Sequence, residues 1–209
     1  AARYLSHDPE RSDVLSVFAG LRPLVRHEGQ ATKKISREHE VLISRGGLVT
    51  IIGGKWTTYR RMAADVVDQA LDVAGLEQRP CATESLHLRG WLDRDDPAMP
   101  CENWLRVYGS DAAEVMAACD EIEGGNDLLH ERLPYPRGVV VHATRHELAR
   151  TVEDVLARRT RSLLLDAAAA SEAADDVAKL MSIELGRDEA WAAEQAADFR
   201  ELAAGYQLS

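Results

Sequence analysis

Between residues 48 and 75, a β-rich run leads directly into two glycines and then into a helix. Residues 48–52 are rich in β-branched side chains, and a similar run at 40–44 precedes them across Arg45-Gly46-Gly47, which predicts a β-hairpin. From residue 59 to residue 74 apolar side chains recur at helical spacing, and Gly75 is a typical stop signal. We therefore expect a hairpin followed by one long amphipathic helix.

The residues before this hairpin add one more β signal. Residues 14–20 predict a short buried strand. Three β segments and one helix are too few to close a doubly wound domain, so we expect residues 1–78 to be a piece of a larger domain. Residues 79–100 carry three of the seven prolines and little periodicity, which predicts a linker.

The remaining residues, 101–209, are almost wholly helical in pattern and rich in alanine. Ser110 is expected to cap a helix, and Thr151 with Asp154 resembles a capping box. The expected helices cover residues 103–107, 111–120, 139–150, 165–185 and 188–203, with Gly186 between the last two. The predicted fold class is an α+β remnant, with few strands and one long helix, followed by an all-α C-terminal domain, so that the chain is mainly helical.

Charge and cysteine usage exclude several classes of protein. The formal net charge of −10 disfavours nucleic acid as a partner, although local cations can still bind a phosphorylated metabolite. No apolar run approaches the roughly 20 residues of a membrane helix, and the first residues show no signal-peptide pattern. The three cysteines make neither a disulfide framework nor a zinc pattern, which indicates a reducing, cytoplasmic location.

The turn at residues 53–58 has the composition of an anion site. Gly53 and Gly54 let the backbone approach a bound group, and Lys55 adds a full positive charge. Thr57 and Thr58 begin the helix, where a threonine can cap and free N–H groups attract negative charge. The residues alone predict a site for a phosphate, a carboxylate or another negative group, and they leave open a plain strand-turn-helix with a surface lysine.

Three blocks of sequence stand out in the first 60 residues. They are Val17-Phe18-Ala19-Gly20-Leu21-Arg22-Pro23-Leu24, Ile35-Ser36-Arg37-Glu38 and Gly53-Gly54-Lys55-Trp56-Thr57-Thr58-Tyr59-Arg60. In their order and approximate spacing they resemble the end of the catalytic domain of FAD-dependent glycerol-3-phosphate dehydrogenases. The third block, Gly-Gly-Lys-x-Thr-Thr-Tyr, is highly specific, and weaker similarities at residues 107–110 and 145–161 extend the resemblance over most of the chain.

This resemblance implies a role for individual residues. Arg22 and Arg37 correspond to arginines that bind the substrate, and Arg37 with Lys55 is placed at the catalytic centre. Lys55 lies near both substrate and flavin, and the turn that holds Gly53, Gly54, Thr57 and Thr58 lies against the pyrimidine edge of the flavin. The implied parent enzyme oxidises glycerol 3-phosphate to dihydroxyacetone phosphate with FAD in glycerol catabolism and passes the electrons to a quinone. Residues 1–78 are then the end of the FAD- and substrate-binding domain, residues 79–100 the linker and residues 101–209 the helical domain.

One expected element of such an enzyme is missing from the sequence. No Gly-x-Gly-x-x-Gly follows a strand, as binding of the FAD pyrophosphate requires, and no strand precedes Gly124-Gly125. We therefore expect the nucleotide-binding half to lie outside this chain. The chain alone is expected to bind FAD weakly or not at all and to be inactive.

Other chemistry-bearing residues are weighed against structural roles. His142 and His146 have metal-ligand spacing without an obvious third ligand, so a structural role is favoured and no metal is expected. His27 and His39 lie near the candidate arginines, where a base would suit alcohol oxidation, but surface positions are favoured. Trp56 is expected to pack under the flavin site, and Cys119 is expected to lie in the core.

Two alternatives stay open at this stage. The helical part could serve as an oligomerisation or membrane-docking module, because basic residues 158–161 are followed by a leucine-rich run that could touch an anionic membrane surface. The parent enzyme could also be an oxidase that uses oxygen in place of a quinone. The expected partners are glycerol 3-phosphate and the quinone, with a peripheral contact at the inner membrane face and a homodimer left open.

Overall fold

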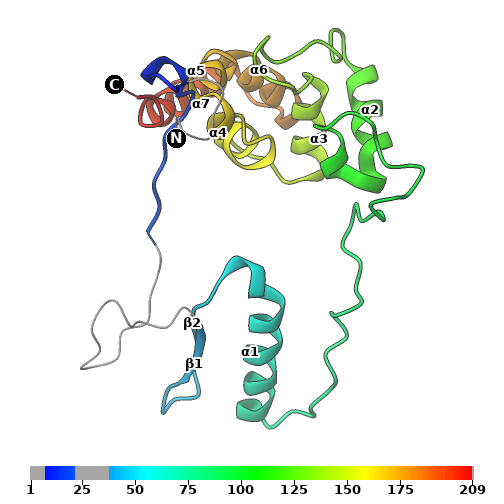
Figure 1. Ribbon diagram of the computed structural model, residues 1–209, viewed down its shortest axis with the longest axis vertical. Coiled ribbons are helices and arrows are strands. Elements are labelled where there is room, and N and C mark those ends of the chain that lie inside the picture. Colours follow the sequence, from blue (N-terminus) through cyan, green and yellow to red (C-terminus); the bar gives the residue numbers. More distant parts are fainter. Residues whose placement is uncertain (1–7, 22–37, 209) are drawn as a thin grey trace. The chain divides into compact units, whose positions relative to one another are not determined.

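The computed structural model describes residues 8–21 and 38–208. They divide into two compact units, which are considered separately (Figure 1). The small unit belongs to the stretch Ala19–His87, and the helical unit combines the N-terminal residues up to Phe18 with Leu88–Ser209. Among the described residues the only sheet has two strands and helices predominate, which confirms the predicted fold class.

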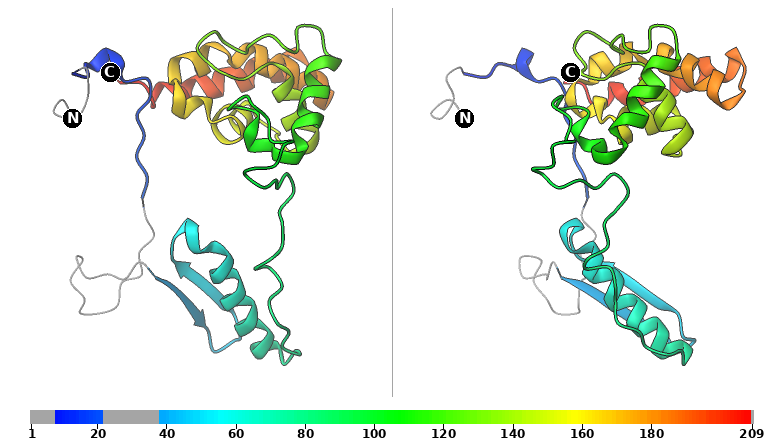
Figure 2. Two further views of the ribbon diagram at one scale, coloured as in Figure 1. Left: turned by 45° about the vertical axis from the view of Figure 1, so that its right-hand side comes forward. Right: turned by 90° about the vertical axis from the view of Figure 1, so that its right-hand side faces the viewer.

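The small unit is a β-hairpin with one helix beside it. Strands β1 (His39–Ile43) and β2 (Val49–Gly53) are antiparallel, in a register that pairs His39 with Gly53. A 3-10 turn (Trp56–Thr58) then leads into α1 (Tyr59–Ala74), which ends at Gly75 in the left-handed conformation. Figure 2 shows α1 running alongside the hairpin. The predicted hairpin, helix and stop signal are confirmed.

The strand predicted at residues 14–20 is wrong. A short 3-10 turn (Arg11–Asp13) is followed by chain without regular secondary structure, and most of its side chains are exposed. The apolar run indicated a buried strand, but its backbone bonds to loops and helix ends of the helical unit and not to a neighbouring strand.

The helical unit packs its helices around two apolar clusters. The larger cluster includes Leu156, Met181 and Phe199, and the smaller one centres on Val115 and Val139. The helices are α2 (Ala112–Glu121), α3 (Gly138–His146), α4 (Ser162–Leu165), α5 (Ala167–Glu172), α6 (Ala174–Leu185) and α7 (Glu189–Ala204), with a 3-10 turn at Arg106–Asp111 and a π-helical turn at Asp154–Arg159. Most of these are the helices that the sequence predicted, with shifted ends.

Two predictions for this unit are wrong because local bonds replaced the expected ones. Ser110 does not cap α2, since the 3-10 turn runs into the helix and the N–H of Ala112 already donates to the carbonyl of Gly109. The single helix expected at residues 165–185 begins only at Ala167 and is divided at Ala173, between α5 and α6; before it, the backbone of Asp166 is extended (φ −154°). Its carboxylate accepts a bond from the N–H of Ala169 and starts a new helix there.

Some capping predictions are confirmed. Thr151 Oγ1 accepts from the N–H of Asp154 at 3.1 Å, and Asp154 Oδ2 accepts from the N–H of Thr151 at 3.1 Å, which is the expected reciprocal capping box. Gly186 ends α6 in the left-handed conformation, as expected. The helix predicted at residues 139–150 stops at His146, because Leu148 adopts a positive φ.

Candidate functional site

Two consecutive glycines shape the turn that leaves β2. Gly53 and Gly54 have φ values of 75° and 81°, in a region that other residues rarely adopt. A Cβ on Gly54 would also lie 2.5 Å from Sδ of Met62, a residue of α1. The turn therefore brings the chain from the strand to the helix over a short distance only because neither position carries a side chain.

Lys55 follows this turn and is exposed, together with Thr57 and Thr58. Among the described residues no carboxylate forms an ion pair with Lys55. Thr58 Oγ1 donates to the carbonyl of Lys55 at 2.9 Å, and it makes no capping bond to α1. The prediction that a threonine side chain caps α1 is therefore wrong, because the 3-10 turn continues directly into the helix. The first backbone bond of this turn is donated by the N–H of Thr58, so the N–H groups of Trp56 and Thr57 come before it.

Two aromatic rings lie beside this lysine. Trp56 is 85% exposed and stacks on Tyr59, with ring centroids 5.4 Å apart and an angle of 24° between the planes. In this chain the indole ring is thus not packed in a core. The turn of residues 53–58 presents backbone N–H groups, one ammonium group and an aromatic surface to its surroundings.

His39 is joined to the helix behind the turn. Its Nε2 lies 2.9 Å from Oδ2 of Asp65, and the other oxygen of Asp65 pairs with Arg61 at 3.0 Å. This arrangement links β1 to α1. The role of Asp65 was not visible in the sequence, because nothing there pairs residue 65 with residue 39.

Three of the residues considered for substrate chemistry cannot be placed next to this turn. Arg22, Arg37 and His27 lie outside the described residues. The structure therefore brings together Gly53, Gly54, Lys55, Thr57 and Thr58, and the two arginines stay predictions.

Comparison with known proteins gives the family of the chain. Residues 48–192, more than half of the chain, match the family described as the C-terminal domain of alpha-glycerophosphate oxidase. The chain belongs to this family. The match contains both the 53–58 turn and most of the helical unit, and it confirms the resemblance stated from the three sequence blocks.

The relatives of this family domain are named glycerol-3-phosphate dehydrogenases. A probable mitochondrial glycerol-3-phosphate dehydrogenase of Caenorhabditis elegans is 39% identical in an alignment that covers 88% of this chain and 28% of that protein. The mitochondrial enzyme of Homo sapiens is 38% identical in an alignment that covers 89% of this chain and 28% of that protein. The mitochondrial enzyme of Arabidopsis thaliana is 33% identical in an alignment that covers 87% of this chain and 33% of that protein. The chain thus spans about a third or less of the length of these relatives.

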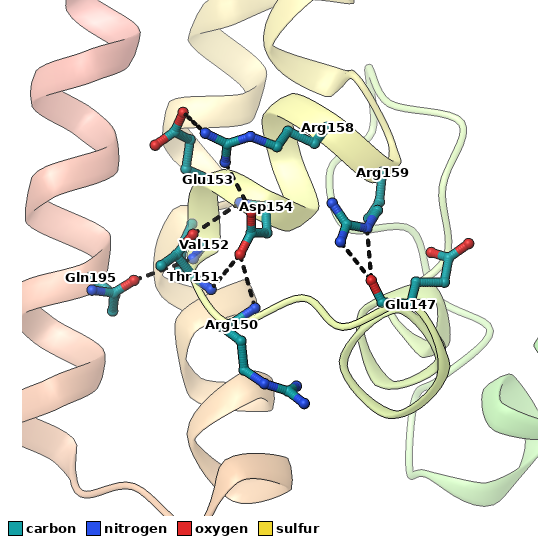
Figure 3. A network of polar contacts seen from close by, with 9 residues as sticks. All are labelled: Glu147, Arg150, Thr151, Val152, Glu153, Asp154, Arg158, Arg159 and Gln195. Carbon is teal, nitrogen blue, oxygen red and sulfur yellow. Dashed lines mark hydrogen bonds and ion pairs between the residues drawn. The ribbon is translucent and has the colours of Figure 1, made fainter. Parts of the chain in front are cut away.

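Arg158 and Arg159, the basic residues of the π-helical turn, bond to other residues of the helical unit (Figure 3). Arg158 donates to the carboxylates of Glu153 and Asp154, at 2.6 and 2.9 Å. The guanidinium fork of Arg159 donates to the backbone carbonyl of Glu147, which ties this turn to the end of α3. These two arginines therefore contact groups within the helical unit.

A buried histidine occupies the middle of α3. His142 is 2% exposed, and its ring contacts Tyr108 edge-on at a centroid distance of 5.5 Å and His146 at 5.1 Å. Burial lowers the pKa of His142, with a further contribution from His146, and burial also raises the pKa of Glu147. Within the described part of the chain no group of three or more His, Cys, Asp or Glu side chains could hold a metal ion. His142 is thus a buried component of the helical unit, and its burial disfavours the charged form of the ring.

The burial of His142 and Glu147 should make the free energy of unfolding depend on pH. Folding lowers the pKa of His142. Below about pH 6.5 the unfolded chain therefore binds a proton at this ring more readily than the folded chain does, and the free energy of unfolding decreases as the pH falls. Glu147 acts in the opposite direction, since its raised pKa lowers stability as the pH rises above about 4.3. Replacing His142→Gln should flatten the fall in the free energy of unfolding between about pH 6.5 and 5, as measured by urea unfolding followed by circular dichroism.

The buried Thr144 of the same helix supplies the control for this experiment, because its hydroxyl does not titrate in this range. Thr144→Val should leave the slope of stability against pH unchanged. If His142→Gln shows the same slope of stability against pH as the unaltered chain, folding does not lower the pKa of His142.

Proposed function

We propose that this chain is the C-terminal part of a flavoenzyme that oxidises glycerol 3-phosphate to dihydroxyacetone phosphate. The family match and the names of the relatives support this reading. The observation that carries it furthest is the turn of residues 53–58, where two glycines in the left-handed region place the exposed Lys55 at the start of a continuous helix. An exposed cation at a helix N-terminus suits an anionic substrate and an electron-accepting ring.

The substrate side of the proposal rests on charge. Glycerol 3-phosphate carries a phosphate group, and the planar fork of arginine binds phosphate oxygens in pairs. We assign this task to Arg22 and Arg37 on the resemblance of their sequence blocks. Lys55 adds a point charge beside the reacting end of the substrate, where it also contributes to catalysis.

The same turn fits one edge of a flavin ring. The N–H groups of Trp56 and Thr57 and the ammonium group of Lys55 are donors, whereas the oxidised ring edge offers acceptor atoms. When bound, FAD accepts the hydride that leaves the substrate carbon. The donors of the turn then stabilise the negative charge that develops on the ring, without rearrangement during the reaction. We propose that the pyrophosphate of FAD is held outside this chain, so the chain alone retains little or no FAD.

The alcohol must also lose a proton, and the sequence favours a surface position for His39 over a role as that base. In the structure Nε2 of His39 pairs with Asp65, and the pair joins β1 to α1. We therefore assign His39 to the fold and place the general base elsewhere in the enzyme.

The electron acceptor and the location of the enzyme are further parts of the proposal. We favour a quinone over oxygen because the relatives are named dehydrogenases, although the family is described by an oxidase. Among the described residues no helix is long and apolar enough to cross a membrane. The relatives are named mitochondrial enzymes, and for this chain we retain the prediction of a cytoplasmic protein with peripheral contact at the inner membrane face. A homodimer remains a further prediction.

An assay of the FAD-loaded full-length protein that carries this chain tests the proposal. We expect reduction of a quinone analogue to depend on glycerol 3-phosphate and to fail with glycerol, because glycerol lacks the phosphate that the cationic groups bind. Oxygen consumption measured in parallel distinguishes a dehydrogenase from an oxidase. Absence of glycerol 3-phosphate-dependent reduction of either acceptor would refute the proposed function.

A further inference from the structure

The first residue of β1 lies beside the turn that carries Lys55. The register of the hairpin pairs His39 with Gly53, the last residue of β2. A Cβ on Gly54 would lie 2.5 Å from Sδ of Met62 and 3.2 Å from Cβ of His39. The space in which Gly54 would carry a side chain is thus filled by one residue of α1 and one residue of β1.

A polar contact ties His39 to the same helix. Its Nε2 lies 2.9 Å from Oδ2 of Asp65, which follows Met62 by three residues and so lies on the same face of α1. The second oxygen of Asp65 pairs with Arg61 at 3.0 Å, which fixes the direction of the carboxylate. The side chains of His39 and Asp65 are only 22% and 26% exposed, so water screens their contact less than it screens a surface ion pair.

The turn itself has little to fix its own geometry. Gly53 and Gly54 adopt positive φ values, and glycine has no Cβ that would restrict its backbone to these angles. The angles must therefore be held by the residues packed around the turn. On the strand side that neighbour is His39, and the contact with Asp65 keeps His39 against α1.

We propose that Asp65 is a positioning residue for the flavin- and substrate-facing turn. Through His39 it holds the turn of residues 53–58 and thereby sets where the ammonium group of Lys55 and the N–H groups of Trp56 and Thr57 point. This inference rests on the proposed function. It adds to that function a carboxylate of α1 that acts through another residue and not on the reacting atoms.

The expected effect follows from how such donors work. They stabilise the charge of the transition state because they are fixed in place beforehand. A misplacement of about 1 Å is enough to slow a reaction about a hundredfold. Removal of Asp65 loosens one neighbour of the turn and leaves Lys55 itself intact, so we expect a smaller loss, of about tenfold.

Steady-state kinetics on the FAD-loaded full-length protein carrying Asp65→Ala test this proposal. Both kcat and kcat/KM should fall about tenfold, because the turn acts on the transition state. KM for glycerol 3-phosphate should stay unchanged, because the phosphate is assigned to the arginines. Asp65→Asn keeps an acceptor oxygen at the same reach and should restore most of kcat. Equal kcat values in Asp65→Ala and the unaltered enzyme would overturn the positioning role.

Asp68 supplies the matched control on the same helix. Its carboxylate is exposed, and among the described residues it makes no side-chain hydrogen bond. Asp68→Ala removes the same charge from α1 and no contact with β1, so kcat should not change. A fall in kcat as large as that of Asp65→Ala would attribute the effect to the charge of the helix and would refute a role for the contact with His39.

Substitution of His39 separates positioning from proton transfer. If Asp65 acts through this ring, His39→Ala should lose as much activity as Asp65→Ala, and the double variant should lose no more than either. Loss of a general base typically costs about a hundredfold or more. A loss of that size in His39→Ala, beside a small one in Asp65→Ala, would place His39 in the reaction itself and overturn the proposal.

Hydrogen exchange in the full-length protein gives a readout that needs no activity. The N–H of Thr58 donates to the carbonyl of Lys55 at 3.0 Å, so the protection of this amide reports the order of the turn. Asp65→Ala should raise its exchange rate severalfold, and Asp68→Ala should not change it. An unchanged rate in Asp65→Ala would overturn the positioning role. Absence of glycerol 3-phosphate-dependent reduction by the unaltered enzyme would overturn the proposed function instead, and the exchange rates would still show whether Asp65 orders the turn.

Discussion

Replacing Lys55→Met is expected to lower kcat/KM for glycerol 3-phosphate about a hundredfold, or roughly 2.7 kcal/mol. The substitution keeps the length and apolar part of the side chain and removes the charge that the turn places beside an exposed helix start. Because no described carboxylate pairs with Lys55, its charge is not neutralised within this part of the chain. A ligand that brings negative charge would therefore gain the full attraction.

The measurement is steady-state kinetics on the FAD-loaded full-length protein, with thermal melting of each variant. The melting temperature should stay unchanged, since Lys55 is exposed and makes no ion pair among the described residues. Lys179→Met is the matched control, because Lys179 is an exposed lysine on α6. If Lys55→Met and Lys179→Met both retain full activity, Lys55 has no place in the catalytic centre.

The second prediction concerns stability and a substitution at Gly138, the first residue of α3. A Cβ at this position would lie 2.3 Å from Cα and 2.6 Å from the backbone nitrogen of Cys119, a fully buried residue of α2. Backbone atoms in the middle of a helix cannot move aside as a flexible side chain can. Gly138→Ala is therefore expected to lower the free energy of unfolding by about 3 kcal/mol, as overpacking of a core does.

Urea unfolding followed by circular dichroism measures this loss. Gly186→Ala separates backbone strain from steric clash, because Gly186 has a φ of 62° with no atom within 4 Å of its Cβ position. That control should cost only about 1 kcal/mol. A loss in Gly138→Ala no greater than in Gly186→Ala would show that α2 and α3 can separate without cost.

Local patterns predicted much of the fold because their causes are local. The helix α1 and its end at Gly75 follow from apolar spacing and from the freedom of glycine, and both were confirmed. The capping box of Thr151 and Asp154 joins groups only three residues apart. The turn at Gly53 and Gly54 was likewise visible as two consecutive glycines between a strand and a helix, and the structure adds their positive φ values.

The predictions that failed depended on partners distant in the sequence or on competing local bonds. Residues 14–20 carry a strand-like apolar run, yet Leu15 and Val17 bond to Ala167 and Tyr206. The alanine-rich stretch after residue 165 favours one helix, but α5 and α6 are separate helices. The helix α5 begins at the cap of Asp166, where the N-terminal segment occupies the break after α4. A threonine of the pair Thr57 and Thr58 was expected to cap α1, and the hydroxyl of Thr58 instead donates to the carbonyl of Lys55.

The sequence by itself determined the family of this chain, its mainly helical character and the turn that carries Lys55, because each depends on residue types at short, fixed spacing. Only the tertiary structure decided what His39 and Arg159 contact, and where residues 15–17 dock. Their partners lie 12 or more residues away along the chain or, for the docked segment, in the C-terminal helices. Such pairings follow from packing, because a helix break leaves backbone N–H and carbonyl groups that another segment can bond. Spacing in the sequence does not reveal them.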